Sequence, residues 1–327
     1  MMKKVSILSL FVALVAIVAV SCNCKTSSCS KIERDSTYTT VNHPEWSRNA
    51  VIYEVNLRQY TPSASIKEFT THLPRLKELG VDILWFMPIH PISELNRKGG
   101  LGSYYAVKDY KAFNPEFGTI EEFKEAVKQA HDLGMKVILD WVPNHTGCDN
   151  AWVTEHPEWF SVNEEGKMYG PFDWTDVYEL NYDNREMRAA MVDALKFWLT
   201  EINVDGFRCD VAGEVPTDFW NDAMAELRAK HPNMFTLAED EAEAQDLTET
   251  AFDMYYGWEL HHIMNSVAQG KKTVEDLWGY FAKADTTIRK EAIRMNFTSN
   301  HDENSWNGTE FERMGDASNL FAVFTYI

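Results

Sequence analysis

Short apolar segments alternate with longer amphipathic segments along the chain from Trp46 onward. The apolar segments have the length and composition of buried β-strands, and they span residues 50–57, 81–88, 136–143, 204–211, 234–240, 251–256 and 293–300. Because strands that alternate with helices pair in parallel through right-handed crossovers, this pattern predicts an α/β protein. Seven such units favour a (β/α)8 TIM barrel over an open doubly wound sheet, and no glycine-rich phosphate loop follows any of these strands.

Three of the amphipathic segments carry clear helix signals. The segments 65–80 and 119–134 each begin with a capping-box pattern and end at a glycine, which predicts one helix in each. Pro74 lies inside the first segment and weakens that prediction, because proline disfavours a helix interior. The segment 185–202 has apolar side chains at near-helical spacing up to Ile202 and predicts a third helix.

The connection between the strand at 136–143 and the helix at 185–202 is unusually long. It contains about forty residues and includes the aromatic-rich stretch AWVTEHPEWF (151–160). Loops of this length without structure of their own are uncommon and are usually functional. We therefore predict a small excursion domain at about 146–184, on the C-terminal face of the barrel.

Composition and charge narrow the range of partners. Hydrophobic residues make up 45% of the 327-residue chain and aromatic residues 13%, which supports a sizeable core. The formal net charge is −19, from 31 basic and 50 acidic residues. This charge argues against nucleic acid and anionic membrane surfaces as partners, since both require basic patches. It is compatible with a neutral substrate such as a sugar.

The first residues have the pattern of an export signal rather than of a folded segment. Lys3 and Lys4 precede a short apolar run that leads to Cys22 in a sequence that resembles a bacterial lipoprotein cleavage box. The resemblance implies a lipoprotein signal peptide over residues 1–22, lipidation of Cys22, and a flexible tether over residues 23–44. We expect a membrane-anchored protein of a bacterial envelope, on the periplasmic side or the cell surface, with a plain membrane anchor as the alternative.

The predicted strand VDGFRCDV (204–211) carries charges on one face. Side chains alternate along a strand, so Arg208 and Asp210 share a face while Phe207 and Cys209 lie on the apolar opposite face. Buried charges cost several kcal/mol unless they are paired. Taken alone, the pattern has two interpretations, a structural ion pair or a functional site.

Polar side chains also gather where other predicted strands end. The residues concerned are Asp140, Asn144 and His145 after the third strand, Arg208 and Asp210 on the fourth, Glu239 after the fifth, and His301 and Asp302 after the seventh. Active sites of such barrels lie at the C-terminal ends of the strands. Three carboxylates are therefore expected to converge on one mouth. His145 and His301 are alternatively core histidines with satisfied neighbours.

These motifs resemble, in order and spacing, those of the α-amylase family of glycoside hydrolases. The matching stretches are DWVPNH (140–145), GFRCDVAGE (206–214), the glutamate that follows the fifth strand, and SNHDE (299–303). VAGEV (211–215) is most similar to neopullulanase and cyclomaltodextrinase-like members. The resemblance covers residues 46 to about 305 and implies a retaining glycoside hydrolase. The implied substrates are α-1,4-glucosidic bonds of starch, maltooligosaccharides or related α-glucans, with α-1,6 bonds left open.

The resemblance also implies a catalytic role for each of three carboxylates. Asp210 would be the nucleophile of a double displacement, and Glu239 would be the acid and base. Asp302 would bind sugar hydroxyls and stabilise the transition state. Asp240 and Glu241 directly follow Glu239 and are alternatives to it.

Substrate-binding roles follow from the same resemblance. The implied binding residues are Tyr105, His145, Arg208 and His301. Tyr105 would stack beneath the sugar ring, with its neighbour Tyr104 as the alternative. Arg208 is expected to lower the pKa of Asp210 and so keep it ionised.

The chemistry requires no cofactor, although a structural calcium is left open. Asn144 resembles a calcium ligand of relatives. The Lys–His pair that also contributes to that site is replaced here by Gly213 and Glu214.

The end of the chain departs from the family pattern. The sequence stops in the apolar run LFAVFTYI (320–327), before an eighth strand. We therefore expect residues 45–327 to form a catalytic barrel that is incomplete at its C-terminus, truncated after about the seventh strand, in a fragment of a longer protein. Two alternatives remain: a non-hydrolytic glucan-binding lipoprotein, and a transglycosylase or isomerase on the same scaffold.

Overall fold

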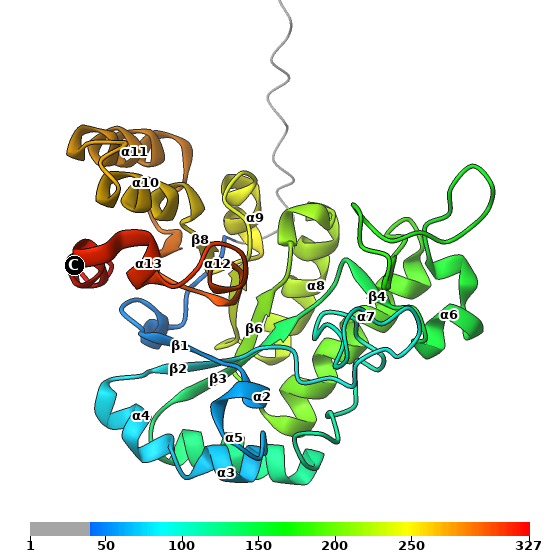
Figure 1. The fold of residues 1–327 in the computed structure, drawn as a ribbon. Helices are drawn as coiled ribbons and strands as arrows, with labels where there is room; N and C mark the ends of the chain where they lie inside the picture. The colour runs from blue at the N-terminus through cyan, green and yellow to red at the C-terminus, as the bar shows by residue number, and fades with distance from the viewer. Residues whose placement is uncertain (1–39) are drawn as a thin grey trace, which may run out of the picture. The chain divides into compact units, whose positions relative to one another are not determined.

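Seven parallel strands form the main sheet of the computed structural model, which describes residues 40–327 (Figure 1). The strands are β1 (Ile52–Val55), β2 (Ile83–Phe86), β3 (Lys136–Trp141), β6 (Gly206–Cys209), β7 (Phe235–Ala238), β8 (Met254–Tyr256) and β9 (Ile293–Met295). They pair in chain order, so β1 and β9 are the edges of the sheet. Each lies inside a predicted strand segment, and within the described residues no strand follows β9. The predicted barrel of parallel strands and helices is confirmed, with seven strands in the described part of the chain.

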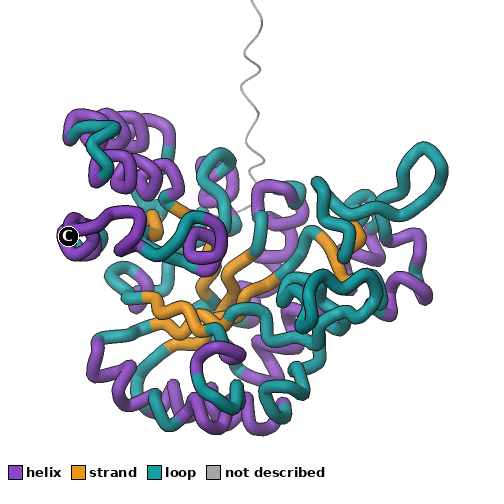
Figure 2. The backbone as a smooth tube through the Cα atoms, viewed as in Figure 1, coloured by secondary structure: helices purple, strands orange, loops and turns teal. Residues whose placement is uncertain are grey.

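Helices surround these strands, which lie together in the middle of the fold (Figure 2). The α-helices are α2 (Leu57–Tyr60), α3 (Ile66–Thr70), α4 (Leu73–Leu79), α5 (Ile120–Asp132), α6 (Ala151–Glu155), α7 (Arg185–Phe197), α8 (Thr217–Lys230), α9 (Ala244–Thr250), α10 (Trp258–Ala268), α11 (Val274–Thr287), α12 (His301–Trp306), α13 (Glu310–Met314) and α14 (Ser318–Phe324). Short 3-10 turns are η1 (Glu45–Ser47), η2 (Pro157–Trp159), η4 (Ala212–Glu214) and η5 (Gly315–Ala317). None of the helices in the described part of the chain is both long and apolar enough to cross a membrane. Cys22, the signal peptide and most of the predicted tether lie outside the described residues.

The helix predicted over 65–80 is two helices, α3 and α4. Pro74 lies in the first turn of α4, where its missing N–H costs little, so the proline begins a helix instead of interrupting one. The Ser65 hydroxyl caps α3 by accepting a hydrogen bond from the Glu68 N–H. The Glu68 carboxylate binds Ser63 instead of completing the predicted capping box. The box predicted at the start of α5 is complete.

The helix predicted over 185–202 changes its winding near the end. The α-helix α7 stops at Phe197, and Trp198–Ile202 form a turn of π-helix, η3. Trp198 and Ile202 are four residues apart and both are buried. The wider π turn keeps both side chains on the face that packs against the barrel.

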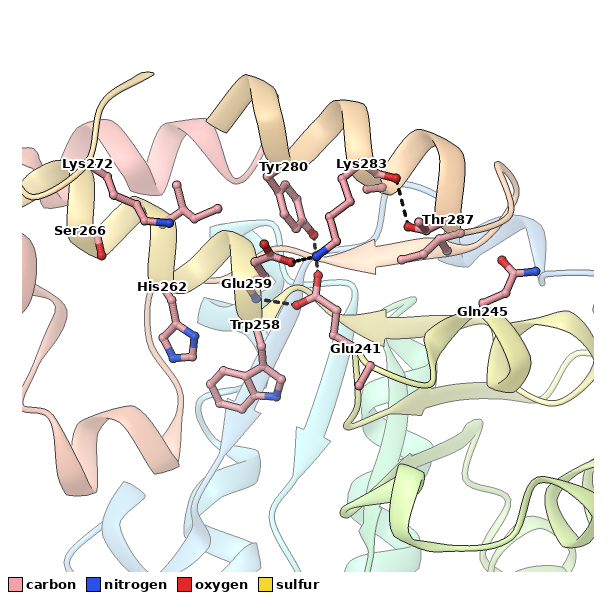
Figure 3. Close-up of a pocket in the computed structure, with 14 residues that line it drawn as sticks. Glu241, Gln245, Trp258, Glu259, His262, Ser266, Lys272, Tyr280, Lys283 and Thr287 are labelled. Atoms are coloured by element: carbon pink, nitrogen blue, oxygen red, sulfur yellow. Dashed lines mark hydrogen bonds and ion pairs between the residues drawn. The ribbon is translucent and has the colours of Figure 1, made fainter. Parts of the chain in front are cut away.

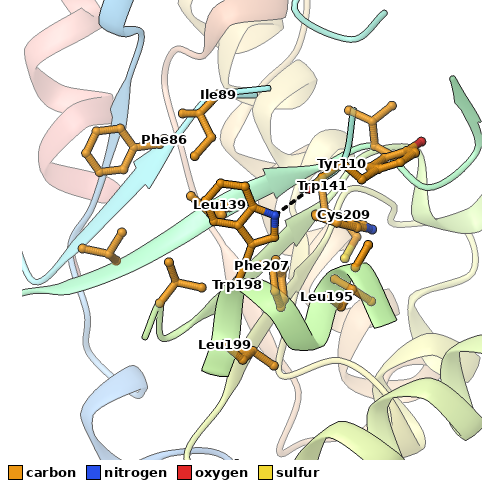
Figure 4. Close-up of a cluster of buried hydrophobic side chains, with 14 of the residues drawn as sticks. Phe86, Ile89, Tyr110, Leu139, Trp141, Leu195, Trp198, Leu199, Phe207 and Cys209 are labelled. Atoms are coloured by element: carbon orange, nitrogen blue, oxygen red, sulfur yellow. Dashed lines mark hydrogen bonds between the residues drawn. The ribbon is translucent and has the colours of Figure 1, made fainter. Parts of the chain in front are cut away.

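The two faces of the sheet carry different side chains, as the alternation predicted. The outer face packs against the helices in a large apolar cluster that includes Trp141, Phe207 and Trp198, whose indole N–H donates to the Tyr110 carbonyl at 2.7 Å (Figure 4). The inner face is apolar near the N-terminal ends of the strands and polar near their C-terminal ends. The buried cluster on that face consists of Ile83, Trp85, Ile138, Phe235, Leu237, Met254, Tyr256, Met295 and Phe297.

The long connection after β3 contains a small sheet of its own. β4 (His145–Gly147) pairs antiparallel with β5 (Val177–Glu179), and α6 lies between them in sequence. This two-stranded sheet is separate from the seven-stranded one and falls within the segment predicted as an excursion domain.

Candidate active site

Arg208 lies at the centre of the polar layer inside the barrel and is fully buried. Its Nη1 donates to Asp140 Oδ1 at 2.8 Å and to Asp210 Oδ1 at 2.9 Å. Its Nη2 lies 2.8 Å from Glu239 Oε2, an ion pair whose direction does not make a hydrogen bond. Its Nε donates to the Tyr256 hydroxyl at 3.2 Å. One planar guanidinium therefore brings together the carboxylates of three neighbouring strands.

The backbone explains why these carboxylates meet. In the sheet register Asp140 on β3 lies beside Arg208 on β6. Asp210 and Glu239 directly follow β6 and β7, and their N–H groups each extend the strand pairing by one hydrogen bond, to Trp141 O at 2.8 Å and Cys209 O at 3.0 Å. Since parallel strands end at the same edge of a sheet, side chains at these positions point into one mouth.

The chain turns sharply after Asp210. Val211 has φ 37° and ψ 51°, a left-handed conformation that is strained for a β-branched residue. Its N–H donates to Glu239 Oε2 at 2.9 Å. The strained turn thus supplies a hydrogen bond to the carboxylate that also forms an ion pair with Arg208.

A second set of polar contacts crosses the mouth of the barrel. The Tyr105 hydroxyl lies 3.1 Å from Asp140 Oδ2 and 2.7 Å from His301 Nε2. His301 Nδ1 is 2.6 Å from Glu54 Oε1. Trp85 Nε1 donates to Asp140 Oδ2 at 3.2 Å. A continuous chain of contacts therefore runs from Glu54 on β1 to Arg208 on β6.

Asp302 lies at the open edge of this cluster. The Asn300 side chain caps α12 by accepting from the Glu303 N–H at 2.8 Å, which places His301 and Asp302 in the first turn of that helix. Asp302 Oδ1 is 3.5 Å from His301 Nε2. Its side chain is 40% exposed, so it is accessible to a molecule entering the mouth.

The structure distinguishes between residues that the sequence left as alternatives. Of the three consecutive acids, only Glu239 contacts Arg208. Asp240 instead accepts from the Glu243 N–H at 2.6 Å, and Glu241 accepts from the Tyr280 hydroxyl at 2.7 Å.

The two consecutive tyrosines also separate. The Tyr104 hydroxyl donates to Asn56 Oδ1 at 3.0 Å, and the ring lies under the guanidinium of Arg58. The Tyr105 ring stacks on His301 with centroids 5.5 Å apart. Tyr105 is therefore the tyrosine that belongs to the cluster.

His145 lies beside the cluster rather than in it. It is buried where β4 begins, and its ring packs edge-on against Trp174 with centroids 5.2 Å apart. Burial lowers the pKa of His145 to about 4, although the charge of Asp176 and the Tyr105 carbonyl oppose this effect. The imidazole is neutral, and its Nδ1 has no hydrogen-bond partner among the described residues.

Burial dominates the ionisation of the central carboxyls. It raises the pKa of Asp210 and of Glu239 above their ordinary values, while the charge of Arg208 opposes the change. Burial raises the pKa of Asp140 to about 7 against the same opposition. Arg208 therefore lowers the pKa of Asp210 as expected, but the pKa of that carboxyl is raised overall, because desolvation of the carboxylate is the larger effect.

The pKa of His301 is raised, whereas the pKa of His145 is lowered. Burial disfavours the charged form of His301, but the hydrogen bond and charge of Glu54 outweigh burial and raise the pKa of His301 to about 9. A protonated imidazolium therefore faces Asp302 and Tyr105 at neutral pH. It adds a second positive charge to a mouth lined with carboxylates.

Sequence reasoning missed several residues of this site. Asp140 was noted at its strand end without a role, while Glu54, Trp85 and Tyr256 were not considered. Glu54 had a usable signal, since it is the only charged residue in the apolar strand AVIYEVNL (50–57). A lone charge on a buried strand requires a partner, and here that partner is His301.

The resemblance implies a calcium ligand at Asn144, which is buried directly before β4. Within residues 40–327 no group of three or more His, Cys, Asp and Glu side chains is placed to hold a metal ion. Asp176, the buried carboxylate whose charge acts on His145, is already paired with Lys98 at 3.3 Å. The calcium ligand suggested for Asn144 stays a prediction, and no step below depends on a metal.

A parallel barrel with carboxylates at its C-terminal mouth, grouped around a buried arginine, has the arrangement expected of a glycoside hydrolase. A family model for "Alpha amylase, catalytic domain" matches residues 64–178 and 156–324. The chain belongs to the alpha-amylase family.

Solved structures and curated relatives agree with this assignment. An alpha-amylase from Lactobacillus plantarum superposes with a TM-score of 0.78 at 38% identity, covering 85% of this chain and 69% of that one. A maltogenic alpha-amylase, AmyB, from Thermotoga neapolitana superposes with a TM-score of 0.73 at 36% identity, covering 79% and 60%.

Two curated relatives carry different activities in their names. The alpha-amylase MalA of Haloarcula japonica is 26% identical over 271 residues, which are 80% of this chain and 40% of that protein. An alpha-1,4-glucan:maltose-1-phosphate maltosyltransferase of Salinibacter ruber is 32% identical over 233 residues, which are 62% and 35%. The chain spans less than half the length of these two relatives.

Proposed function

We propose that the chain is a retaining glycoside hydrolase that cleaves α-1,4-glucosidic bonds in starch, maltooligosaccharides or related α-glucans. The observation that carries the proposal is the contact of Asp210 and Glu239 with the same guanidinium. Retaining enzymes need two carboxyls about 5–5.5 Å apart, and one planar group between them enforces a short separation. The proposal includes cleavage of some α-1,6 bonds as a secondary specificity.

In the first step the Asp210 carboxylate attacks the anomeric carbon while the bond to the leaving oxygen breaks. Glu239 gives its proton to that oxygen. The two carboxyls suit these different roles because Arg208 donates a hydrogen bond to Asp210, which favours its ionised form. Glu239 has an ion pair with Arg208 and a hydrogen bond from the Val211 N–H, but burial is the largest effect on its pKa and favours its protonated form.

In the second step water attacks the glycosyl ester of Asp210, and Glu239 accepts the proton from that water. Two inversions at the same carbon retain the configuration. The exposed carboxylate of Asp302 and the charged imidazole of His301 would bind sugar hydroxyls. Tyr105 and the neutral His145 would line the same subsite.

A transferase is the second candidate because maltosyltransferases are among the relatives. In a transferase or transglycosylase a sugar hydroxyl, rather than water, attacks the ester of Asp210. An isomerase would return the released sugar to the same ester through another hydroxyl. All three reactions use the same carboxylates, so the products distinguish them.

The test is release of reducing ends from soluble starch by the full chain beside Asp210→Asn. Asp132→Asn is a matched control, because Asp132 pairs with Lys128 on the exposed face of α5. We expect release by the parent and the control and none by Asp210→Asn. No release by the parent, with starch still bound, would instead favour a glucan-binding protein. Longer products formed from maltotriose would favour the transferase.

The membrane anchor rests on the sequence pattern alone. We propose that Cys22 carries the lipid that attaches the protein to a bacterial envelope membrane. Cys22 lies outside the described residues, and the pattern of Lys3, Lys4 and the following apolar run supports the proposal.

A further inference from the structure

Glu303 is a buried carboxylate that the proposed reaction does not use. It directly follows Asp302 in the first turn of α12, and it is 6% exposed. Successive residues of a helix point in different directions, so Glu303 is buried inside the fold while Asp302 is accessible at the mouth. A buried carboxylate is costly unless it is paired, so the partners of Glu303 indicate what it does.

These partners come from α10, from α13 and from the end of α12 itself. Glu303 Oε2 lies 3.2 Å from His261 Nε2 on α10 and 3.6 Å from Arg313 Nε on α13. Glu303 Oε1 accepts a hydrogen bond at 3.3 Å from Asn307 Nδ2, in the residue that follows α12. The backbone N–H of Glu303 donates to the Asn300 side chain at 2.8 Å and so closes the start of α12. One residue therefore caps this helix and joins it to two others.

Arg313 supplies the counter-charge for Glu303. Burial lowers the pKa of His261, although hydrogen bonds and the charge of Glu303 oppose this effect. The imidazole is therefore neutral at neutral pH, whereas Arg313 is a permanent cation and is 8% exposed. Its Nη2 donates to the Thr298 carbonyl at 2.6 Å and its Nη1 donates to the Gly308 carbonyl. The same guanidinium thus holds the chain before α12, after α12 and at Glu303.

The helix α10 is held in place by contacts of its own. Glu241, in the loop after β7, accepts hydrogen bonds from the Tyr280 hydroxyl of α11 at 2.7 Å and from the Glu259 N–H of α10 (Figure 3). A buried apolar cluster with members on α10, α11, α13 and α14 packs these helices together. The carboxylate of Glu303 therefore connects α12 to a group of helices that is tied to β7.

The position of Asp302 depends on the helix that carries it. Its carboxylate is 3.5 Å from His301 Nε2, which is longer than a usual hydrogen bond. His301 is bound to Glu54 on β1 at 2.6 Å. The residue before Asp302 is therefore attached to β1, and the residue after it, Glu303, is attached to α10 and α13. Asp302 lies between these two attachments.

We propose that Glu303 is a positioning residue, whose ion pair with Arg313 fixes the first turn of α12 so that the Asp302 carboxylate faces the mouth. The inference rests on the proposed function, in which Asp302 stabilises the transition state. A residue that only supports the fold affects stability. A residue that positions Asp302 also affects kcat more than KM, because the lost interaction is stronger in the transition state than in the bound substrate.

The experiment compares kcat and KM for release of reducing ends from soluble starch between the full chain and Glu303→Gln. Glutamine has the shape of glutamate but no charge, so it cannot form the ion pair with Arg313. We expect kcat to fall by about tenfold or more and KM to change by less than about threefold, since misplacing a catalytic group by about 1 Å can cost about a hundredfold. Glu303→Asp keeps the charge and should recover part of the lost kcat.

Asp205→Asn is the matched control. Asp205 is another largely buried carboxylate, with a side chain that is 12% exposed, and it pairs with His131 at 2.6 Å and with Lys136 at 2.9 Å. It directly precedes β6 and so lies at the opposite end of the strands from the mouth. Its substitution should lower the melting temperature without changing kcat. Circular dichroism gives the melting temperature of each variant, and all activities are measured well below the lowest of them.

A parental kcat in Glu303→Gln, or an equal fall of kcat in Asp205→Asn, overturns this inference and leaves the proposed function standing. If Glu303→Gln does not fold, Arg313→Lys decides, because lysine keeps the charge but cannot bind Glu303 and both backbone carbonyls at once. Its kcat should fall at nearly unchanged KM, and a parental kcat would again overturn the inference. If the parent releases no reducing ends from starch, both proposals fail.

Discussion

Replacing Arg208 by methionine tests whether its charge holds the mouth of the barrel together. The guanidinium is fully buried and contacts Asp140, Asp210 and Glu239 at 2.8–2.9 Å. Methionine has a similar length and fills much of the space, but it leaves three buried carboxyls without their common counter-charge. Removing one partner of a buried ion pair costs about 3–5 kcal/mol. We expect the free energy of unfolding to fall by about that amount near pH 7.5.

The loss of stability in Arg208→Met should be larger at higher pH. Burial already raises the pKa of Asp140 to about 7 and raises those of Asp210 and Glu239, and without Arg208 all three rise further. A carboxyl with a higher pKa when folded takes up protons on folding. Stability therefore falls as pH rises from the unfolded pKa near 4 towards the folded one. The destabilisation should be smaller near pH 5 than near pH 7.5.

Urea unfolding followed by tryptophan fluorescence at both pH values measures these differences. Lys128→Met is the control, because Lys128 pairs with Asp132 at 2.6 Å and the two side chains are 65% and 63% exposed. An exposed pair of this kind contributes at most about 1 kcal/mol. A loss below about 1 kcal/mol for Arg208→Met near pH 7.5, or an equal loss at both pH values, would refute the reasoning.

Two further predictions concern Gly206 and Glu54. A Cβ at Gly206 would lie 1.8 Å from the Phe235 carbonyl oxygen, so Gly206→Ala must push β6 and β7 apart and should lower the free energy of unfolding by about 1–3 kcal/mol. Gly279 lies inside α11 with open space around it, so Gly279→Ala should raise the free energy of unfolding by up to about 1 kcal/mol. Calorimetric melting measures both variants, and equal stability changes for Gly206→Ala and Gly279→Ala would contradict the reasoning. Glu54→Gln should lower the pKa of His301 from about 9 in an NMR titration, with Glu54→Asp keeping part of the shift. The pair stabilises the fold below the unfolded histidine pKa of about 6.5 and loses that effect as pH rises through 9, so an unchanged titration would exclude the ion pair.

The sequence by itself determined the elements and their class. Seven strands lie where apolar segments predicted them, because the strand pattern is local and each segment had to be buried between neighbours. The capping box at the start of α5 could also be predicted, because it too is formed by residues close together in the sequence. The shared face of Arg208 and Asp210 followed from strand alternation alone, and the structure places both side chains inside the barrel.

Only the tertiary structure decided which side chains meet. Glu54 and His301 are 247 positions apart, and nothing near either residue in sequence indicates the other. The choice of Glu239 over Glu241 depended on which acid reaches Arg208 across the barrel. Whether the pKa of Asp210 is raised or lowered depended on how completely the folded barrel excludes water from the carboxyl. That burial raises the pKa more than the nearby Arg208 lowers it. Periodicity and capping are properties of short segments, whereas partners, burial and cavities arise from residues that only the closed fold brings together.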